Sequence, residues 1–162
     1  MTAAWDFETF LTQITPRLTR YCAAVAGTAD GEDAAQEALI RTWQHRHRIP
    51  GEEAAAVFAY RTAYRLCVDA LRRRKKEQAA WEEREETGTA EDGLSQKTAA
   101  ALRQLPPADR AIVYSRVMEE EPYRRIAERF GKTEAWARKR YSLAIKKLAA
   151  LLGGGNDETK TI

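Results

Sequence analysis

The sequence of 162 residues lacks the features of a secreted, membrane-spanning or enzymatic protein. No apolar run approaches the roughly 20 residues that a membrane-spanning helix needs. The N-terminal segment MTAAWDFETF has neither the basic nor the apolar part of a secretory signal. No nucleophile–base pair, metal-ligand cluster or phosphate-binding glycine loop is visible. We therefore expect a cytoplasmic protein that is not an enzyme, does not insert into a membrane and needs no cofactor or metal.

Cysteine is scarce as well. Cys22 and Cys67 lie far apart in helix-like segments, so they form neither a disulfide pattern nor a metal-binding pattern. We expect both to be small buried residues. His45 and His47 stand two positions apart, and such residues face different sides of a helix, which argues against a shared metal ion.

The strict alternation of apolar and polar residues that marks β-strands is absent, and apolar residues recur at helical spacing instead. The predicted fold class is all-α, with two small helical domains joined by a flexible acidic linker. We expect the first domain at 1–76, the linker at 77–95, the second domain at 96–152 and a disordered tail at 153–162. Helices are expected near 5–26, 30–48, 53–76, 94–105 and 108–118, with Gly27 ending the first and Asp30 capping the second.

The net charge is only +3, but the charges are segregated along the chain. Residues 77–97 hold seven acidic and two basic residues, whereas residues 122–149 hold nine basic and two acidic ones. Another basic cluster, Arg72 to Lys76, precedes the acidic stretch. Segregation of this kind favours a nucleic-acid partner over a membrane.

The stretch from Pro122 to Leu148 predicts a helix-turn-helix. One face of its first helix is apolar and consists of Tyr123, Ile126, Ala127 and Phe130. Gly131 follows, where helices often need a left-handed conformation, and Thr133 can cap the next helix. The buried stripe expected on that helix is Ala137, Tyr141, Ala144 and Leu148. A turn of this length with a glycine is typical of the motif.

Arg138 and Lys139 stand beyond the apolar stripe, near the start of the second helix. In a helix-turn-helix, this end of the recognition helix reaches base edges in the major groove. The alternative is an ordinary helical hairpin with a solvated basic face.

Three separated stretches of the chain resemble one family of proteins. The first, DAAQEALIRTW at 33–43, resembles the second region of the bacterial sigma-70-type sigma factors, and the second, YRTAYRLCVDALRRR at 60–74, resembles the helix that follows it. LPPADRAIVYSRVMEEEPYRRIAERFG at 105–131 resembles the fourth region with its helix-turn-helix. The spacing is too short for a third domain. The chain is therefore similar to the extracytoplasmic-function (ECF) subgroup, which has domains two and four only.

The resemblance implies a transcription initiation factor. Such a protein binds core RNA polymerase, directs it to specific promoters and helps to open the DNA strands. Domain two captures the downstream (minus-10) element as a single strand, and domain four reads the upstream (minus-35) element as duplex. The catalysis belongs to the polymerase, and the family commonly has an anti-sigma factor as a further partner.

The polymerase-binding residues follow from the same resemblance. Asp33, Gln36, Glu37 and Arg41 fall at i, i+3, i+4 and i+8, so they share one polar stripe. In the family, this surface docks on the coiled coil of the largest polymerase subunit, and Trp43 matches an aromatic residue found there. Without the resemblance, a solvated helix face would be the favoured interpretation.

The minus-10 residues lie on the third predicted helix, which combines the aromatic and basic side chains that hold unstacked bases. They are Phe58, Tyr60, Arg61, Tyr64, Arg65, Arg72 and Arg73. Phe58 stands at the usual tryptophan position and Arg65 at the usual asparagine position. Core packing is the alternative for Phe58 and Tyr64.

The minus-35 residues implied by the resemblance lie in the helix-turn-helix. They are Arg124, Thr133, Glu134, Arg138, Lys139 and Ser142. Lys139 stands where a short polar residue is common, and its longer cationic side chain can donate either to guanine or to phosphate. Trp136 and Ala137 stand where family members often carry a small residue and a valine. We therefore expect Trp136 to pack in the core, with a base or sugar contact as the alternative.

Two other functions fit parts of the sequence. A stand-alone helix-turn-helix regulator would bind duplex DNA tightly without polymerase, usually at a palindrome. A helical adaptor that binds only protein would show no salt-dependent affinity for DNA. The polar stripe of the second helix together with the basic third helix favours the sigma factor.

Overall fold

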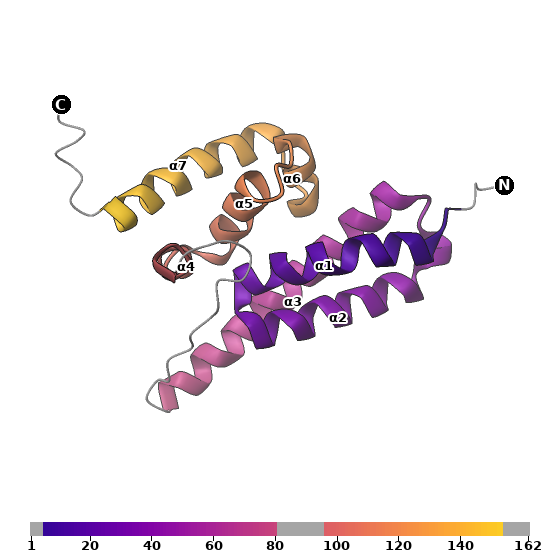
Figure 1. The fold of residues 1–162 in the computed structure, drawn as a ribbon, viewed down its shortest axis with the longest axis horizontal. Helices are drawn as coiled ribbons and strands as arrows, with labels where there is room; N and C mark the ends of the chain where they lie inside the picture. Colours follow the sequence, from indigo (N-terminus) through magenta and orange to yellow (C-terminus); the bar gives the residue numbers. More distant parts are fainter. Residues whose placement is uncertain (1–4, 81–95, 154–162) are drawn as a thin grey trace. The chain divides into compact units, whose positions relative to one another are not determined.

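The computed structural model describes residues 5–80 and 96–153, and every regular element within these ranges is helical (Figure 1). The all-α class predicted from the sequence is therefore confirmed. The chain divides into two compact units, Met1–Thr87 and Gly88–Ile162. Residues 81–95, which hold most of the expected linker, and residues 154–162, which hold all but the first residue of the expected tail, lie outside the described residues.

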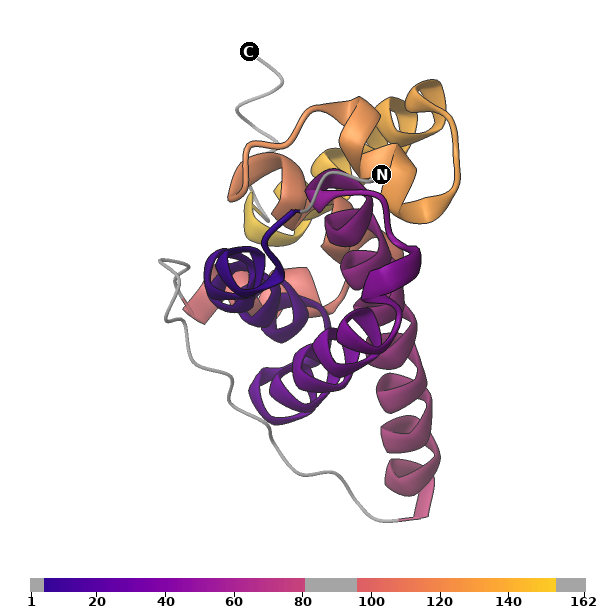
Figure 2. The same ribbon diagram turned by 90° about the vertical axis from the view of Figure 1, so that its right-hand side faces the viewer.

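Unit 1 is a bundle of α1 (Phe7–Ala26), α2 (Thr28–Gln44) and α3 (Glu52–Ala80), with a short 3-10 helix, η1 (Arg46–Arg48), before α3. The three long helices lie side by side, and α3 continues past the other two in both views (Figures 1 and 2). The centre of the bundle is formed by residues without solvent exposure: Leu18, Tyr21, Val25, Ala38, Thr42, Tyr60, Ala63 and Cys67. Both cysteines are free and buried, as predicted.

The junctions around α2 differ from the expectation in detail. Asp30 does not cap the helix: the N-cap residue is Gly27, with a φ of 96°, and α2 begins at Thr28. Asp30 lies in the first turn instead, and its carboxylate pairs with Arg74 of α3 at 3.0 Å. Asp6 caps α1, and hydrogen bonds from the Thr9 side chain and from backbone N–H groups lower the pKa of its carboxyl.

Gly31 marks the closest approach of α1 and α2. A Cβ atom at this position would lie 2.7 Å from the backbone of Cys22 and Ala23, which cannot move aside as a flexible side chain would. Gly31→Ala should therefore destabilise the bundle by roughly 1–3 kcal/mol, although alanine is the better helix former. Thermal unfolding followed by circular dichroism measures the change. Gly51→Ala is the matched control, since no atom lies within 4 Å of its Cβ position. Equal melting temperatures for the two variants would contradict the close-packing argument.

Unit 2 consists of α4 (Gln96–Arg103), α5 (Pro107–Val117), α6 (Tyr123–Phe130) and α7 (Glu134–Gly153). One core cluster joins α4, α5 and α7 through Ala101, Leu102, Leu105, Val113, Ala144 and Leu148. A second joins α5, α6 and α7 through Ile112, Ile126, Ala127 and Ala137. The apolar faces predicted for the helix-turn-helix are the faces that these clusters bury.

The turn between α6 and α7 has the predicted chemistry. Gly131 ends α6 in a left-handed conformation with φ 65° and ψ 34°. Two residues later, the Thr133 hydroxyl oxygen accepts a hydrogen bond from the backbone N–H of Trp136 at 3.1 Å. This capping bond satisfies one of the free N–H groups at the start of α7. The two conformational constraints fix the direction in which the second helix leaves the first.

Candidate docking and DNA-binding surfaces

The first candidate surface is the docking face, which we define as Asp33, Gln36, Glu37, Arg41 and Trp43 of α2. It lies on the side of α2 opposite the buried stripe, and Trp43 is 49% exposed. Arg41 Nε donates to Glu37 Oε2 at 2.9 Å across one helical turn. This pair is exposed to solvent, so it contributes little to the stability of unit 1.

An exposed apolar patch on the same helix was not expected from the sequence. Ile40 is 51% exposed and precedes Trp43 by three positions, so the two side chains are neighbours on the helix surface. The guanidinium of Arg46 lies 3.7 Å from the Trp43 ring and donates to the Trp43 carbonyl oxygen at 2.8 Å. An exposed apolar pair bordered by charged groups is typical of protein interfaces. The sequence does indicate this exposed apolar residue, because the helical spacing places Ile40 outside the buried stripe of α2.

The second candidate surface is the middle of α3. Phe58, Arg61 and Arg65 follow one another at helical spacing, with Tyr64 beside them, so these residues share a face. Arg61 and Arg65 are exposed, whereas Phe58 and Tyr64 are half-buried. The Phe58 ring packs against His45 with 5.1 Å between ring centroids. This face combines aromatic edges with cations, as the prediction requires.

Tyr60 corrects one assignment on α3. Its side chain has no solvent exposure, and its ring packs edge-on against Tyr21 of α1 with 4.7 Å between centroids. A base could stack on this ring only if the core of unit 1 opened. The expectation that Tyr60 contacts the minus-10 element is therefore wrong. Its position on the helix, roughly opposite Phe58, turns it toward α1.

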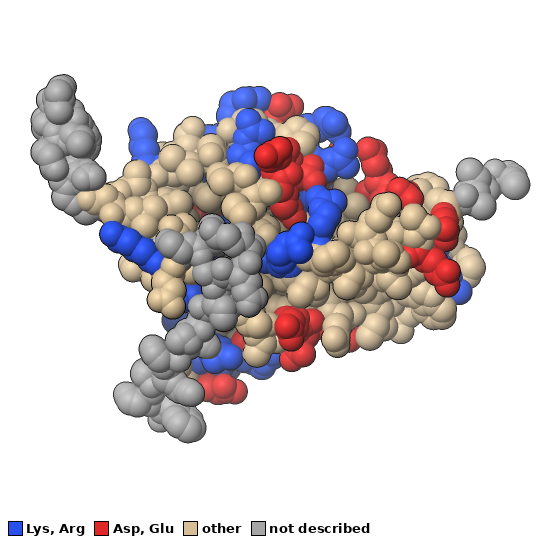
Figure 3. All heavy atoms as spheres, in the orientation of Figure 1, with Lys and Arg blue, Asp and Glu red and all other residues tan. Residues whose placement is uncertain are grey.

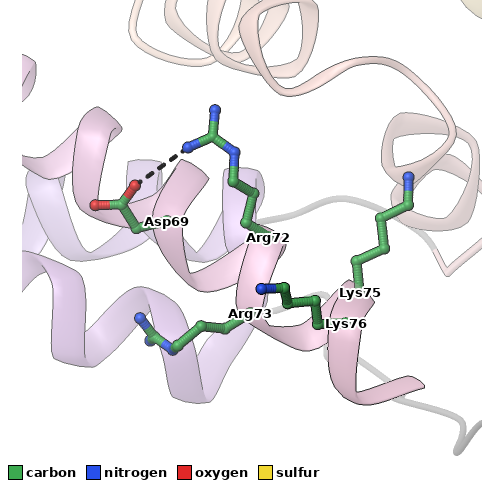
Figure 4. A pocket seen from close by; sticks show the side chains of 5 residues that line it. All are labelled: Asp69, Arg72, Arg73, Lys75 and Lys76. Atoms are coloured by element: carbon green, nitrogen blue, oxygen red, sulfur yellow. Dashed lines mark ion pairs between the residues drawn. The ribbon is translucent and has the colours of Figure 1, made fainter. Parts of the chain in front are cut away.

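The basic end of α3 forms a third cluster. Asp69, Arg72, Arg73, Lys75 and Lys76 surround its last turns, and their side chains spread in different directions (Figure 4). Arg72 pairs with Asp69 at 3.5 Å. Arg73 also lines a groove between α2 and α3 whose walls carry acidic residues such as Asp33 and Glu37. Arg72 and Arg73, two of the four arginines assigned to the minus-10 element, thus stand beside carboxylates, which lowers the positive potential that they present to phosphates.

The recognition helix α7 presents Arg138 and Lys139 to solvent. Basic side chains gather over α6 and the adjoining end of α7, with a few acidic ones between them (Figure 3). Arg138 donates to Glu134 at 2.8 Å, and its guanidinium lies 4.5 Å from the Tyr123 ring. Arg124 and Ser142, the remaining minus-35 residues, are exposed, and Thr133 forms the cap described above.

Trp136 packs as predicted. It lies against the second core cluster, and its ring is 5.4 Å from Phe130 between centroids. Lys132 and Arg140 place their cations 5.7 and 5.4 Å from the same ring. Trp136 is thus one of the residues that join α6 to α7.

Two arginines of the basic segment are structural, which the sequence did not reveal. Arg129 is 4% exposed and donates to Ser115 Oγ and Glu119 at 3.0 Å each, and to Glu121 at 3.2 Å. Arg140 donates to Asp109 at 2.7 and 2.9 Å. These ion pairs tie α6 and α7 to α5 and its following turn. The charge of Arg129 is thereby buried, whereas the side chain of Arg140 stays 35% exposed.

Comparison with known proteins adds an independent finding. Residues 7–77 match the family described as sigma-70 region 2, and residues 95–148 match the family described as sigma-70, region 4. A sigma factor RpoE from Bartonella quintana, solved in complex with the anti-sigma factor NepR, is similar in fold, with a TM-score of 0.73 and 18% sequence identity. The similarity covers 93% of this chain and 99% of that one. Comparison with curated proteins finds no significant relative.

Across residues 5–80 and 96–153, none of the helices is both long enough and apolar enough to cross a bilayer.

Proposed function

The chain belongs to the sigma-70 family, as a transcription initiation factor with the two-domain architecture of the ECF subgroup, and we propose that three separate surfaces bind the polymerase and the two promoter elements. As a sigma factor, it binds core RNA polymerase and directs it to promoter DNA. The docking face of α2, extended by Ile40, binds the polymerase. The middle of α3 captures the minus-10 element, and the exposed start of α7 reads the minus-35 element.

The observation that supports this division is the contrast between the two candidate DNA surfaces. Phe58 and Tyr64 on α3 offer aromatic edges beside Arg61 and Arg65, and such a combination suits bases that have left the stack. The start of α7 is polar and cationic, which suits the major groove of a duplex. A stand-alone regulator needs only the second kind of surface. An initiation factor needs both, because strand opening is favourable only when the separated strand is held.

Three further parts of the proposal follow from this role. The protein itself carries out no catalysis, since the polymerase joins the nucleotides. It acts in the cytoplasm, where polymerase and promoter DNA are found. An anti-sigma factor restrains it, as the NepR complex of the similar Bartonella protein suggests.

Strand opening tests the role of α3 most directly. Replacing Tyr64 and Arg65 with alanine should spare the closed complex but reduce opening by at least about fivefold, since stacking contributes ~1–3 kcal/mol per base. Permanganate reactivity of thymines in the minus-10 element measures opening, and a gel-shift assay measures the closed complex. Arg20→Ala, an exposed site on α1, is the matched control. Normal thymine reactivity in the double variant would remove α3 from the proposal.

A further inference from the structure

The aromatic ring of Tyr123 is shared by two arginines from different helices. The guanidinium carbon of Arg138 on α7 lies 4.5 Å from the ring centroid, and that of Arg116 on α5 lies 4.1 Å from it. Tyr123 itself is the first residue of α6. This stack therefore joins three helices of unit 2 at one point, immediately beside the exposed start of the recognition helix.

Contacts with neighbouring side chains hold the Tyr123 ring in place. Tyr123 is half-buried and packs edge-on against Tyr141 of α7, with 5.9 Å between centroids. Arg116 donates to the backbone carbonyl of Glu121 at 3.0 Å. The Glu121 carboxylate in turn accepts from the buried Arg129 at 3.2 Å. A continuous series of contacts thus connects the buried ion-pair network of unit 2 to the ring on which Arg138 rests.

Arg138 has little else to define its position. Its ion pair with Glu134 is exposed, with 57% and 52% of the two side chains open to solvent, and such pairs are weak. A free arginine side chain also loses considerable rotamer entropy when it binds. A ring that already holds the guanidinium reduces this loss, which is the general advantage of preorganisation. The stack accordingly prepares Arg138 for binding before DNA arrives.

We propose that Tyr123 is a positioning residue that holds the guanidinium of Arg138 in the orientation from which Arg138 reads the minus-35 element. This inference rests on the proposed function, because it requires Arg138 to discriminate bases. Tyr123 acts through Arg138, and the property of Tyr123 that matters is its ring rather than its hydroxyl group. Arg116 keeps the ring in place from α5.

The experiment uses the full chain assembled with core RNA polymerase. Affinity is measured for a preferred promoter and for variants with single base changes across the minus-35 element. The proteins compared are the wild type, Tyr123→Leu, Tyr123→Phe, Arg138→Ala and the Tyr123→Leu/Arg138→Ala double variant. Arg103→Gln, an exposed position on α4, controls for a general loss of positive charge. Thermal unfolding of each free protein reports any change in stability.

We expect the loss of discrimination to be confined to one base position of the minus-35 element. Tyr123→Leu reduces discrimination about two- to fivefold at the same base position that Arg138→Ala affects, as the loss of one partly exposed cation–π contact implies. Tyr123→Phe keeps the ring and behaves as the wild type. The double variant discriminates no worse than Arg138→Ala alone, because the ring has no function once the arginine is gone.

Three results would overturn the inference. One is Tyr123→Leu with unchanged discrimination while Arg138→Ala loses it. Another is an equal loss for Tyr123→Phe and Tyr123→Leu, which would assign the effect to the hydroxyl group. The third is a uniform loss at all positions together with a lowered melting temperature, which would make Tyr123 a stability residue only. If Arg138→Ala itself leaves discrimination unchanged, it is the proposed role of α7 that fails.

Discussion

Charge reversal on the docking face should weaken association with core RNA polymerase by at least about tenfold. Glu37→Arg and Arg41→Glu each place a repulsive charge on a surface proposed to be complementary to the polymerase, and like charges opposed across an interface cost several kcal/mol. The folded state should hardly change, because the Glu37–Arg41 pair is exposed and contributes little to stability. Pull-down or fluorescence titration with purified core polymerase measures association, and thermal unfolding measures stability.

The double variant Glu37→Arg/Arg41→Glu sharpens this test. It restores an ion pair between the two positions, so the helix itself is nearly unchanged, yet the charge pattern presented outward is inverted. We expect the double variant to associate as poorly as either single variant. Arg20→Glu on α1 provides a charge reversal at an exposed position outside the docking face. Normal association of the double variant would contradict the role of the docking face.

Substitutions at the start of α7 should separate base reading from phosphate binding. If Arg138 contacts a base, Arg138→Ala should cost ~1–3 kcal/mol on the preferred minus-35 sequence and relax preference at one position. If Lys139 meets only phosphate, Lys139→Ala should weaken binding to all sequences alike and reduce the salt slope by about 1. Competition binding at several salt concentrations distinguishes the two patterns. Unchanged affinity and salt slope in the Arg138→Ala/Lys139→Ala variant would exclude both roles.

Local features of the chain could be predicted because single residues determine them. Gly131 is placed where a left-handed residue ends α6, and Thr133 is placed where a side-chain oxygen meets a free N–H of α7. The buried stripes of both helices follow from the 3.6-residue period alone. The turn and the buried faces of the helix-turn-helix can therefore be predicted from the sequence, and the family resemblance adds the two-domain architecture.

The sequence does not reveal which residues far apart in the chain pair with one another. Arg129 and Arg140 are the same residue type as the exposed Arg138, and only the positions of Glu121 and Asp109 in the folded unit decide which arginines form ion pairs between helices. The same holds for Tyr60, whose burial depends on Tyr21 of another helix. The same type of residue can be either buried or exposed. Tertiary packing decides which, and the local sequence pattern does not reveal it.

The helix junctions show a related limit. Asp30 is a good capping residue in a suitable position, yet the chain begins α2 two residues earlier because Gly27 permits a positive φ. Asp30 then serves a tertiary role by pairing with Arg74 on α3. Several residues near a helix start can serve as its N-cap, and the sequence alone does not show which of them does.

The central claim is that this chain gives promoter specificity to core RNA polymerase. The most direct measurement is transcription initiation in vitro, with purified core polymerase and a library of genomic DNA fragments, in the presence and absence of the purified chain. The account predicts initiation at a defined set of fragments only when the chain is added. Without polymerase, the chain should bind duplex DNA weakly and with a strong dependence on salt. If core polymerase gains no specificity across the library, while the chain alone binds a palindromic duplex tightly, the account is contradicted and a stand-alone regulator takes its place.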